Sequence, residues 1–583
     1  MDRLRLLFSI DLRSLAAMRI GLAITSLYAL AVLAPDLATF YSDHGLTVRD
    51  WDAPHQRYGG LSVLLLSGGA WLAWLLWTVG VVASLIFLVG WRGRVAAAVL
   101  WVVWVSFTSR NAFVVQGGDQ LMGLLLFWCM FLPISARFSV DQALTPQDRH
   151  GPQSICSVAT VGLLLQVLYV YVFGALMKTS EVWFPNASAI YVALHLDTFV
   201  TGLGIWLREY GLLMQLLTLF VFLLELLTPI LLFFPDARLW VRKVTLALLI
   251  DMHIGFRFFL HIGHFWMVSL SSLMAYVPSD WWNWLAAQWW RADQKRFEIW
   301  YDRDCGFCRK VALILKVFFL PPGIPVRPAQ DHPEIGPLLE REVSWVVVDG
   351  TGRRWLHWDA VALVMRQNIL LRPLGWLAAL YGWVGLGRPT YDLIGRSRGD
   401  LGLVTRLLSA PRVLVGMPGR ITSAALALII LLVFGWNLAH VTPLAPAIPA
   451  PAEVALRAAG KSQFWGMFAP SPPLRDSIPI VTVVDGDDAN LFLKPPRADR
   501  FDHWVDHFPS HRWRKYLNNL RIMDEVTRKL YLRRYANHAC GIAAARSPAT
   551  AIRIELITRQ TTAGFSRTEE VENWGTWPCP PPQ

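Results

Sequence analysis

Long runs of uncharged, apolar residues alternate with short polar connections through the first half of the chain. Eight runs precede residue 280 and a ninth comes much later; they are residues 15–34, 61–90, 95–109, 120–136, 158–177, 211–234, 244–256, 262–277 and 421–439. Most are long enough to cross about 30 Å of hydrocarbon as helices. The pattern predicts a mostly α-helical, polytopic membrane bundle over residues 1–290 and a final transmembrane helix at 421–440.

Two segments carry a different pattern. Residues 295–400 contain short apolar strands at 297–301 and 343–349 and amphipathic helices at 309–320 and 359–368, which predict a small α/β domain. Residues 452–583 are less hydrophobic than the bundle and predict a small extramembrane α+β domain at the C-terminus.

Composition supports a membrane protein. Charged residues make up 16% of the chain and hydrophobic residues 54%, whereas about a quarter of an average soluble protein is charged. The net charge of +12 could indicate nucleic acid binding, but the basic residues gather at the ends of apolar runs rather than in a dense stripe. We therefore expect the lipid bilayer as a partner, and no nucleic acid.

The positions of the basic residues predict an orientation. If the spans simply alternate, one face of the membrane receives Arg3, Arg5, Arg13, Arg92, Arg94, Arg242 and Lys243. The positive-inside rule makes this face cytoplasmic. Counting onward places residues 295–400 in the cytoplasm and the C-terminal domain outside, in a multi-pass protein of a bacterial plasma membrane.

A C-x-x-C motif stands between a predicted strand and a predicted helix. Cys305 would lie in the first helical turn, where unpaired backbone N–H groups and the helix dipole favour the thiolate, and Cys308 would follow one turn later. Cys305 is then the attacking thiol and Cys308 the resolving thiol, with Asp302 or Asp304 as acceptor for the resolving proton. A zinc site needs a second ligand pair, which the nearby single histidines do not supply, so we expect no metal. Two incidental core cysteines remain the alternative.

Two further cysteines lie in the C-terminal domain. If this domain faces an oxidising compartment, Cys540 and Cys579 are free to form a structural disulfide. Two unrelated free thiols are the alternative.

The C-x-x-C segment resembles the DCC family of thiol-disulfide oxidoreductases. Asp302, Cys305 and Cys308 match its D-x-x-C-x-x-C motif, and Tyr391-Asp392 with Arg396 matches a pattern near its C-terminal end. The resemblance implies a thioredoxin-like fold and a redox-active dithiol.

Residues 10 to about 280 resemble the HTTM family, which is related to vitamin K-dependent γ-carboxylase. The residues that carry this resemblance are Phe40 to Asp43 with Gly45, Gly174 to Trp183, and Glu225 with Pro229. Residues 464–470 look like a motif of proteins that fuse HTTM and DCC domains. In the carboxylase a lysine deprotonates vitamin K hydroquinone, and Lys178 falls at the matching position.

Four polar residues of the bundle form a candidate second site. Lys178, His261 and His264 are all expected at the outer side, where they could face one pocket and abstract a proton from a quinone-like lipid, the one cofactor that the sequence suggests. Glu225, Asp251 and His253 lie within spans, where ionisable groups are costly. They either hold helices together, with Arg19 as a candidate partner for Glu225, or form a proton path. For Lys178 the simpler alternative is snorkelling of the ammonium to the interface.

These observations favour a membrane-tethered thiol-disulfide oxidoreductase that reduces a protein or small-molecule disulfide, because a cytosolic C-x-x-C pair rests as the dithiol. One alternative is a bundle enzyme related to γ-carboxylase with Lys178 as base. The other is a membrane scaffold without catalytic activity.

Overall fold

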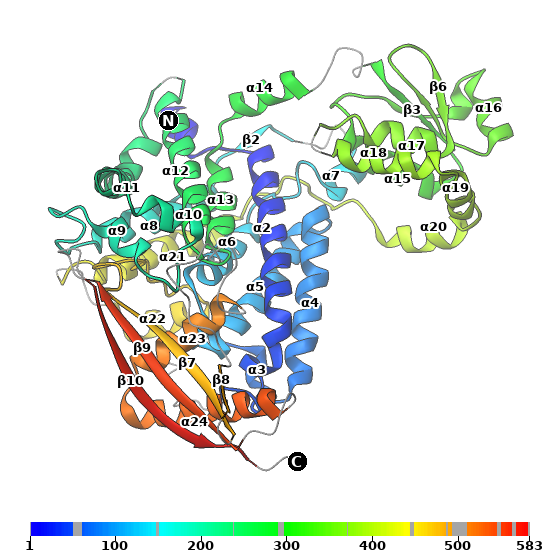
Figure 1. Cartoon of the computed structure of the whole chain (residues 1–583). Coiled ribbons are helices and arrows are strands. Elements are labelled where there is room, and N and C mark those ends of the chain that lie inside the picture. The colour runs from blue at the N-terminus through cyan, green and yellow to red at the C-terminus, as the bar shows by residue number, and fades with distance from the viewer. Residues whose placement is uncertain are drawn as a thin grey trace.

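The computed structural model describes most of the chain as helix, with three small sheets (Figure 1). The described residues are 2–49, 61–146, 151–236, 238–289, 296–369, 371–443, 448–485, 488–491, 510–544, 550–561 and 567–580.

Nine helices form the bundle, one for each predicted apolar run. They are α2 (Leu12–Leu33), α4 (Ala70–Val89), α5 (Gly93–Arg110), α6 (Gly117–Cys129), α8 (Val158–Leu176), α11 (Gly211–Leu232), α12 (Trp240–Phe259), α13 (Phe265–Leu273) and α21 (Arg420–Ala439). Local chemistry sets some of their ends: the Asp11 carboxylate caps α2 by accepting a hydrogen bond from the Arg13 amide at 2.8 Å, and Gly90 ends α4 with φ of 69°.

Within the described residues, five helical segments are long and apolar enough to span a membrane on their own. They are residues 12–41, 70–89, 158–176, 211–232 and 420–439. Of the other four bundle helices, α6 and α13 are short, and α5 and α12 carry charged residues. The prediction of nine spans is therefore supported for five of them by length and composition.

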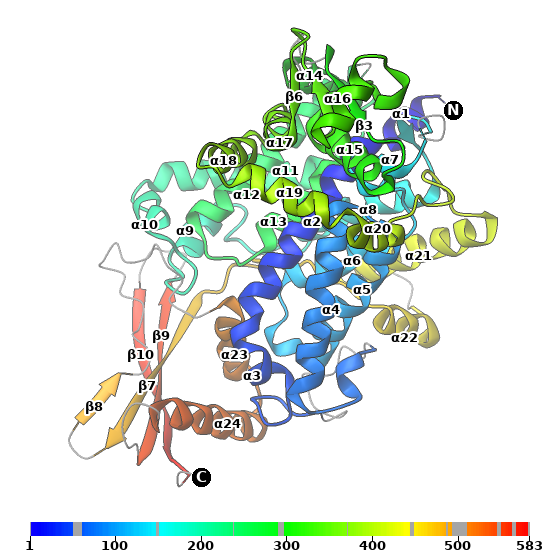
Figure 2. The same ribbon diagram turned by 90° about the vertical axis from the view of Figure 1, so that its right-hand side faces the viewer.

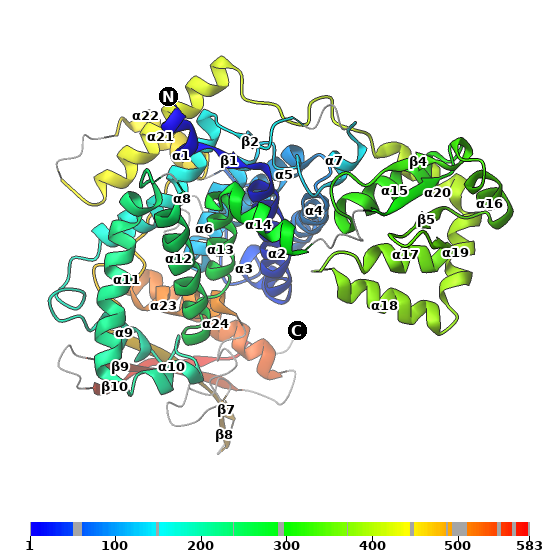
Figure 3. The same cartoon turned by 90° about the horizontal axis from the view of Figure 1, so that it is seen from above.

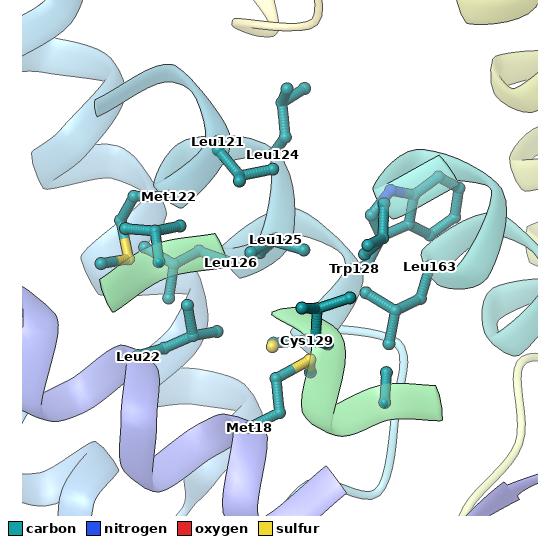
Figure 4. Packing of buried hydrophobic residues seen from close by; sticks show 14 of the residues in the cluster. Met18, Leu22, Leu121, Met122, Leu124, Leu125, Leu126, Trp128, Cys129 and Leu163 are labelled. Atoms are coloured by element: carbon teal, nitrogen blue, oxygen red, sulfur yellow. The ribbon is translucent and has the colours of Figure 1, made fainter. Parts of the chain in front are cut away.

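The bundle core is closely packed where α2, α6 and α8 meet (Figure 4). Met18 and Leu22 of α2 lie against leucines of α6, and Trp128 of α6 lies against Leu163 of α8. A Cβ atom at Gly162 would lie 2.3 Å from the Trp128 ring, so this glycine is what lets the indole lie flat on α8.

Short elements lie between and beside the bundle helices. They are α1 (Asp2–Phe8), β1 (Ile10–Asp11), α3 (Leu37–Tyr41), α7 (Val140–Leu144), β2 (Ser154–Ile155), α9 (Ala189–Leu194), α10 (Gly202–Leu207), α14 (Ser279–Trp289) and α22 (Ala450–Ala458), with short 3-10 turns at residues 34–36, 63–65, 112–114 and 274–276.

The segment with the C-x-x-C motif forms its own four-stranded sheet, which we call the C-x-x-C unit. Its elements are β3 (Glu298–Tyr301), α15 (Gly306–Phe319), β4 (Val326–Pro328), α16 (Ile335–Glu342), β5 (Val346–Val348), β6 (Arg354–Leu356), α17 (His357–Met365), α18 (Arg372–Trp383), α19 (Gly387–Arg396) and α20 (Arg398–Leu407). The strand order is β4-β3-β5-β6, with β3 and β4 parallel and the other pairs antiparallel. The parallel pair follows from α15, which carries the chain back to start β4 in the direction of β3.

The C-terminal segment forms a second sheet with two helices, which we call the C-terminal unit. Its elements are β7 (Arg475–Asp485), β8 (Asp488–Leu491), α23 (His511–Arg521), α24 (Glu525–Ala544), β9 (Ala551–Thr561) and β10 (Arg567–Pro578). The order is β10-β9-β7-β8, and all pairs are antiparallel.

The two units lie at opposite ends of the bundle. Figures 1 and 2 both show α15 to α19 near one end of α2, and β7 to β10 with α24 near the other. Seen from above, α15 to α20 project to one side of the bundle (Figure 3). This arrangement agrees with alternating spans, which put the two units on opposite faces; which face is cytoplasmic stays a prediction.

Polar contacts fasten the C-terminal unit to the bundle. The Arg512 guanidinium pairs with Asp119 of α6 at 2.8 Å, and both side chains are at most 2% exposed. Arg514 donates to the Thr198 carbonyl at 2.9 Å and to the His261 carbonyl at 2.6 Å. We call this contact the outer seam.

Candidate functional site

A cavity of about 200 Å³ lies among α8, α11 and α12. Its wall is mostly apolar, and residues of the segment 465–472, which follows the last bundle helix, complete it. The titratable side chains in the wall are Tyr171, Lys178, Glu225, Asp251 and His253. Phe220 lines the cavity and is also 39% exposed on the lipid-facing side of α11, so the cavity borders the surface that lipid would cover.

Lys178 and Glu225 form an ion pair in this wall. Lys178 stands two residues after the end of α8, and its Nζ contacts Oε2 of Glu225 in the middle of α11. The side chains are 5% and 11% exposed, and Nζ lies 4.4 Å from the centre of the Trp183 ring. The Lys178 side chain is therefore directed into the bundle.

A second polar pair adds to the same wall. The Tyr171 hydroxyl lies 2.9 Å from His253 Nε2, and both side chains are buried. In the part of the chain that the structure describes, His253 Nδ1 has no hydrogen-bond partner. The sequence singled out His253 and Asp251 as costly residues within a span but did not single out Tyr171, although it precedes Lys178 by seven residues, or two helical turns.

The predicted histidines lie elsewhere. His264 caps α13, where Nδ1 lies 3.0 Å from Gln116 Nε2 and Nε2 lies 3.5 Å from Asp119. His261 donates its backbone N–H to the Phe199 carbonyl at 2.6 Å. Neither is in the cavity wall; both belong to the outer seam, and the structure does not bring them together with Lys178.

The expected partnership of Glu225 with Arg19 is wrong. Arg19 is fully buried in α2 and donates to the carbonyl oxygens of Phe87, at 3.2 Å, and Phe138. Phe87 lies near the end of α4, and Phe138 lies in the loop that follows α6. Arg19 therefore holds these two segments together, at the other end of the bundle from Lys178.

The segment 463–472 is held against the cavity by side chains of the bundle. Gln166 of α8 donates to the Gln463 side chain at 2.8 Å, and the Trp465 indole N–H donates to the same Gln463 oxygen at 2.7 Å. The Trp183 indole N–H donates to the Phe468 carbonyl at 2.9 Å. The motif around residues 464–470 thus forms part of the cavity wall.

The cavity lies in a region with known relatives. Residues 9–281 match the family model of the HTTM domain. The match confirms the resemblance expected for this part of the chain, and it contains every titratable residue of the cavity wall. No curated protein and no solved structure matches the chain. The HTTM match ends before the C-x-x-C unit, and the comparisons give no support to the DCC resemblance.

Outside the HTTM region, the C-x-x-C motif stands at the start of α15. Cys305 is the N-cap residue, and the Cys308 amide lies 3.1 Å from its Sγ. The two sulfurs are joined as a disulfide, and both residues are half-buried. The backbone N–H of Cys308, in the first turn, therefore faces the sulfur that would become the thiolate.

The two aspartates of the motif contact the turn rather than the sulfurs. Asp302 accepts hydrogen bonds from Gln330 Nε2 at 2.8 Å and from the Asp304 amide at 3.2 Å, which stabilises the turn before α15. Asp304 is exposed. Among the described contacts, neither carboxylate bonds to a cysteine of the motif.

The remaining predicted cysteines are bonded to each other. Cys540 of α24 and Cys579, just after β10, form a disulfide that ties the helix to the sheet. In the described residues, no group of three His, Cys, Asp or Glu side chains is placed to hold a metal ion.

Proposed function

We propose that the HTTM region is the catalytic part of a carboxylase-like membrane enzyme, and that its cavity binds the ring of a quinol-like lipid for deprotonation by Lys178. The observation that carries the proposal is the buried Lys178–Glu225 pair in the wall of a mostly apolar cavity. A cavity of this volume takes a ring system, with the tail left in the bilayer. Intramembrane ionisable residues that face a cavity are typical of functional sites.

In the proposed mechanism Glu225, which contacts Nζ, takes up the Lys178 proton and leaves a neutral amine to act as the base. The neutral amine then takes the proton of a substrate hydroxyl, which leaves a quinolate and an ammonium. The Trp183 ring face, 4.4 Å from Nζ, stabilises the ammonium that forms.

The test uses the purified full-length protein and a short-chain naphthoquinol under anaerobic conditions. The expected result is a quinolate absorbance band on binding, at a pH where the free quinol is protonated. Lys178→Ala and Lys178→Arg should both lose the band, since a guanidinium does not give up its proton.

Lys243→Met is the matched control. Lys243 is also a buried lysine in an ion pair, but its partner Asp280 is 56% exposed and the pair lies outside the cavity wall. It should keep the quinolate band. A quinolate band that persists in Lys178→Ala would show that Lys178 is not the base.

We propose a second function for the C-x-x-C unit, which is thiol-disulfide exchange with Cys305 as nucleophile and Cys308 as resolving thiol. Three observations favour it: the disulfide across the motif, the placement of Cys305 at a helix N-terminus, and a β4-β3-β5-β6 sheet with α15 between its parallel strands, as in thioredoxin-like folds. Cys305 thiolate attacks a substrate disulfide, and Cys308 then displaces the reduced substrate and closes the motif disulfide.

A redox titration of the full chain tests this function. The Cys305–Cys308 peptide, followed by mass spectrometry, should titrate reversibly as a two-electron couple and reduce insulin, and Cys305→Ser should do neither. A pair that stays oxidised or reduced at all potentials, together with no naphthoquinol binding, would favour the membrane scaffold.

The direction of this exchange depends on the membrane face. Positive-inside counting supports a cytoplasmic C-x-x-C unit, and therefore reduction. In reduced intact cells, an impermeant maleimide should leave Cys305 unmodified. Labelling of Cys305 from outside would reverse the orientation and favour oxidation.

A further inference from the structure

A second and larger cavity separates the C-x-x-C unit from the bundle. It measures about 830 Å³. One wall comes from α15 and the residues up to Arg327, and the other comes from α7, α14 and the segments around Arg137 and Gln153. We call it the inner cleft, because it lies at the end of the bundle opposite the C-terminal unit.

The inner cleft is lined by cations without acidic residues. Its charged lining residues are Arg13, Arg137, Arg309, Lys316 and Arg327, and none of the described lining residues is Asp or Glu. Much of the remaining wall is apolar and includes Phe138, Trp282, Leu313 and Leu320.

Among Arg13, Arg309, Lys316 and Arg327, only Arg13 has an ion pair in the described part of the chain. Arg13 pairs with Asp11 at 2.7 Å. The Arg137 guanidinium donates to the Ala136 and Pro152 carbonyl oxygens, and the Arg327 guanidinium lies 5.8 Å from the Trp300 ring centre.

Arg309 and Lys316 stand on the face of α15 that lines the cleft. Within the described residues, neither side chain has a hydrogen bond or an ion pair with a protein group. Partial burial lowers the pKa of Lys316, because the ammonium is partly withdrawn from water. Such grouped cations repel one another unless an anion lies among them.

Topology alone does not account for these charges. Arg13 and Arg137 flank bundle helices, where the positive-inside rule expects basic residues. Arg309, Lys316 and Arg327 belong instead to the C-x-x-C unit, on α15 and β4, yet they line the same cleft. Two separately folded parts of the chain therefore contribute the same sign of charge to one space.

We propose that the inner cleft binds an amphiphile with a phosphate group, its phosphate held among Arg309, Lys316 and Arg327 and its apolar body against the apolar wall. Guanidinium groups match phosphate oxygens in geometry and charge, and basic pockets beside bundle helices bind anionic lipid headgroups. The phosphate group can belong to a phospholipid of the adjacent leaflet or to a soluble phosphorylated compound, and the recognition chemistry is the same.

The test measures binding to the full-length protein in neutral detergent at fixed ionic strength. The probes are dihexanoyl phosphatidylglycerol, dihexanoyl phosphatidylcholine and hexyl phosphate. Phosphatidylglycerol should bind about tenfold more tightly than phosphatidylcholine, a difference worth about 1.4 kcal/mol. Hexyl phosphate that binds as tightly as phosphatidylglycerol would identify a soluble ligand, and weaker binding of hexyl phosphate would identify the lipid headgroup.

Two triple variants with equal charge loss separate the cleft from general electrostatics. Arg309→Gln/Lys316→Gln/Arg327→Gln should abolish the preference for the anionic probe. Arg341→Gln/Arg353→Gln/Arg388→Gln, which changes exposed cations of the same unit outside the cleft, should keep it. Should the first variant not fold, Lys316→Gln alone should weaken phosphatidylglycerol binding about threefold, or about 0.6 kcal/mol. Equal binding of the two lipids, or a preference that survives loss of the cleft cations, would overturn the proposal.

Discussion

The bundle holds its two extramembrane units in different ways. At one end the C-terminal unit inserts buried side chains into the outer seam, where Arg512 pairs with Asp119 and both are almost fully buried. At the other end the C-x-x-C unit contacts the bundle across α7 and α15, and the inner cleft lies between the unit and the bundle. The segment that joins α20 to α21 adds exposed contacts, such as Arg92 Nη2 to Ser409 Oγ at 2.8 Å.

This difference separates a structural unit from a tethered one. Buried charge pairs destabilise a protein strongly when one partner is lost, whereas exposed polar contacts contribute little. We expect the C-terminal unit to unfold together with the bundle. Substitutions or redox changes within the C-x-x-C unit should alter the stability of that unit and leave the stability of the bundle almost unchanged.

The largest expected effect comes from the outer seam. Arg512→Met leaves the Asp119 carboxylate buried without its cation, although Asp119 keeps its role in capping α6 through the Gln116 amide at 3.0 Å. The free energy of unfolding should fall by about 3–5 kcal/mol. Thermal unfolding in detergent and limited proteolysis of the C-terminal unit measure this loss.

Lys529→Met is the control for the seam. It removes the exposed pair with Glu525 on α24, which should cost less than about 1 kcal/mol. An equal loss of stability in Arg512→Met and Lys529→Met would show that the outer seam does not hold the C-terminal unit on the bundle.

The disulfide of the C-terminal unit should contribute more to stability than the disulfide of the C-x-x-C unit. Cys540 and Cys579 are 39 residues apart, and loss of a cross-link over such a loop costs about 4 kcal/mol in the chain-entropy description. Cys305 and Cys308 are separated by 3 residues, and the same description gives about 2 kcal/mol. Unfolding of Cys540→Ser and Cys305→Ser should show this order, and the reverse order would contradict a structural role for the first bond.

The outer seam should also respond to pH through Asp476. Burial raises the pKa of this carboxyl from 3.8 to about 6, even though Thr198 donates two hydrogen bonds to it. Because the folded value is raised, the stabilising contribution is present below pH 3.8 and is lost as pH rises through 6. The shift corresponds to about 3 kcal/mol.

Asp476→Asn isolates this contribution. The wild-type protein should lose stability between about pH 4 and pH 6, and the variant should show a flatter profile over the same range. Identical pH profiles for both proteins would assign the dependence to other groups.

The sequence predicted what depends on local pattern. Each of the nine apolar runs is a helix, and the predicted strands at 297–301 and 343–349 contain β3 and β5. The helix expected from residue 309 begins at Gly306, because Cys305 caps it and the turn before it is stabilised by Asp302. The periodicity of apolar residues does not reveal a helix N-cap formed by a sulfur atom.

The sequence alone did not predict which residues far apart in the chain contact each other. Lys178 and Glu225 are 47 residues apart, and Arg512 and Asp119 are 393 apart. Placing His264 on the same outer side as Lys178 was not enough to place them together, because Lys178 turns into the bundle towards α11 and His264 turns towards the C-terminal unit. Depth and direction of a side chain depend on how helices pack, which span counting does not provide.

The smallest expected effect tests the tethered end. Arg92→Ala removes the exposed contact with Ser409, in the segment between α20 and α21, and should lower the free energy of unfolding of the bundle by less than about 1 kcal/mol. Because the same change loosens the segment that ties the C-x-x-C unit to the bundle, proteolysis within residues 408–419 should become faster while thermal unfolding changes only slightly. A loss as large as that of Arg512→Met would mean that both ends are built alike, and the distinction between a structural and a tethered unit would fail.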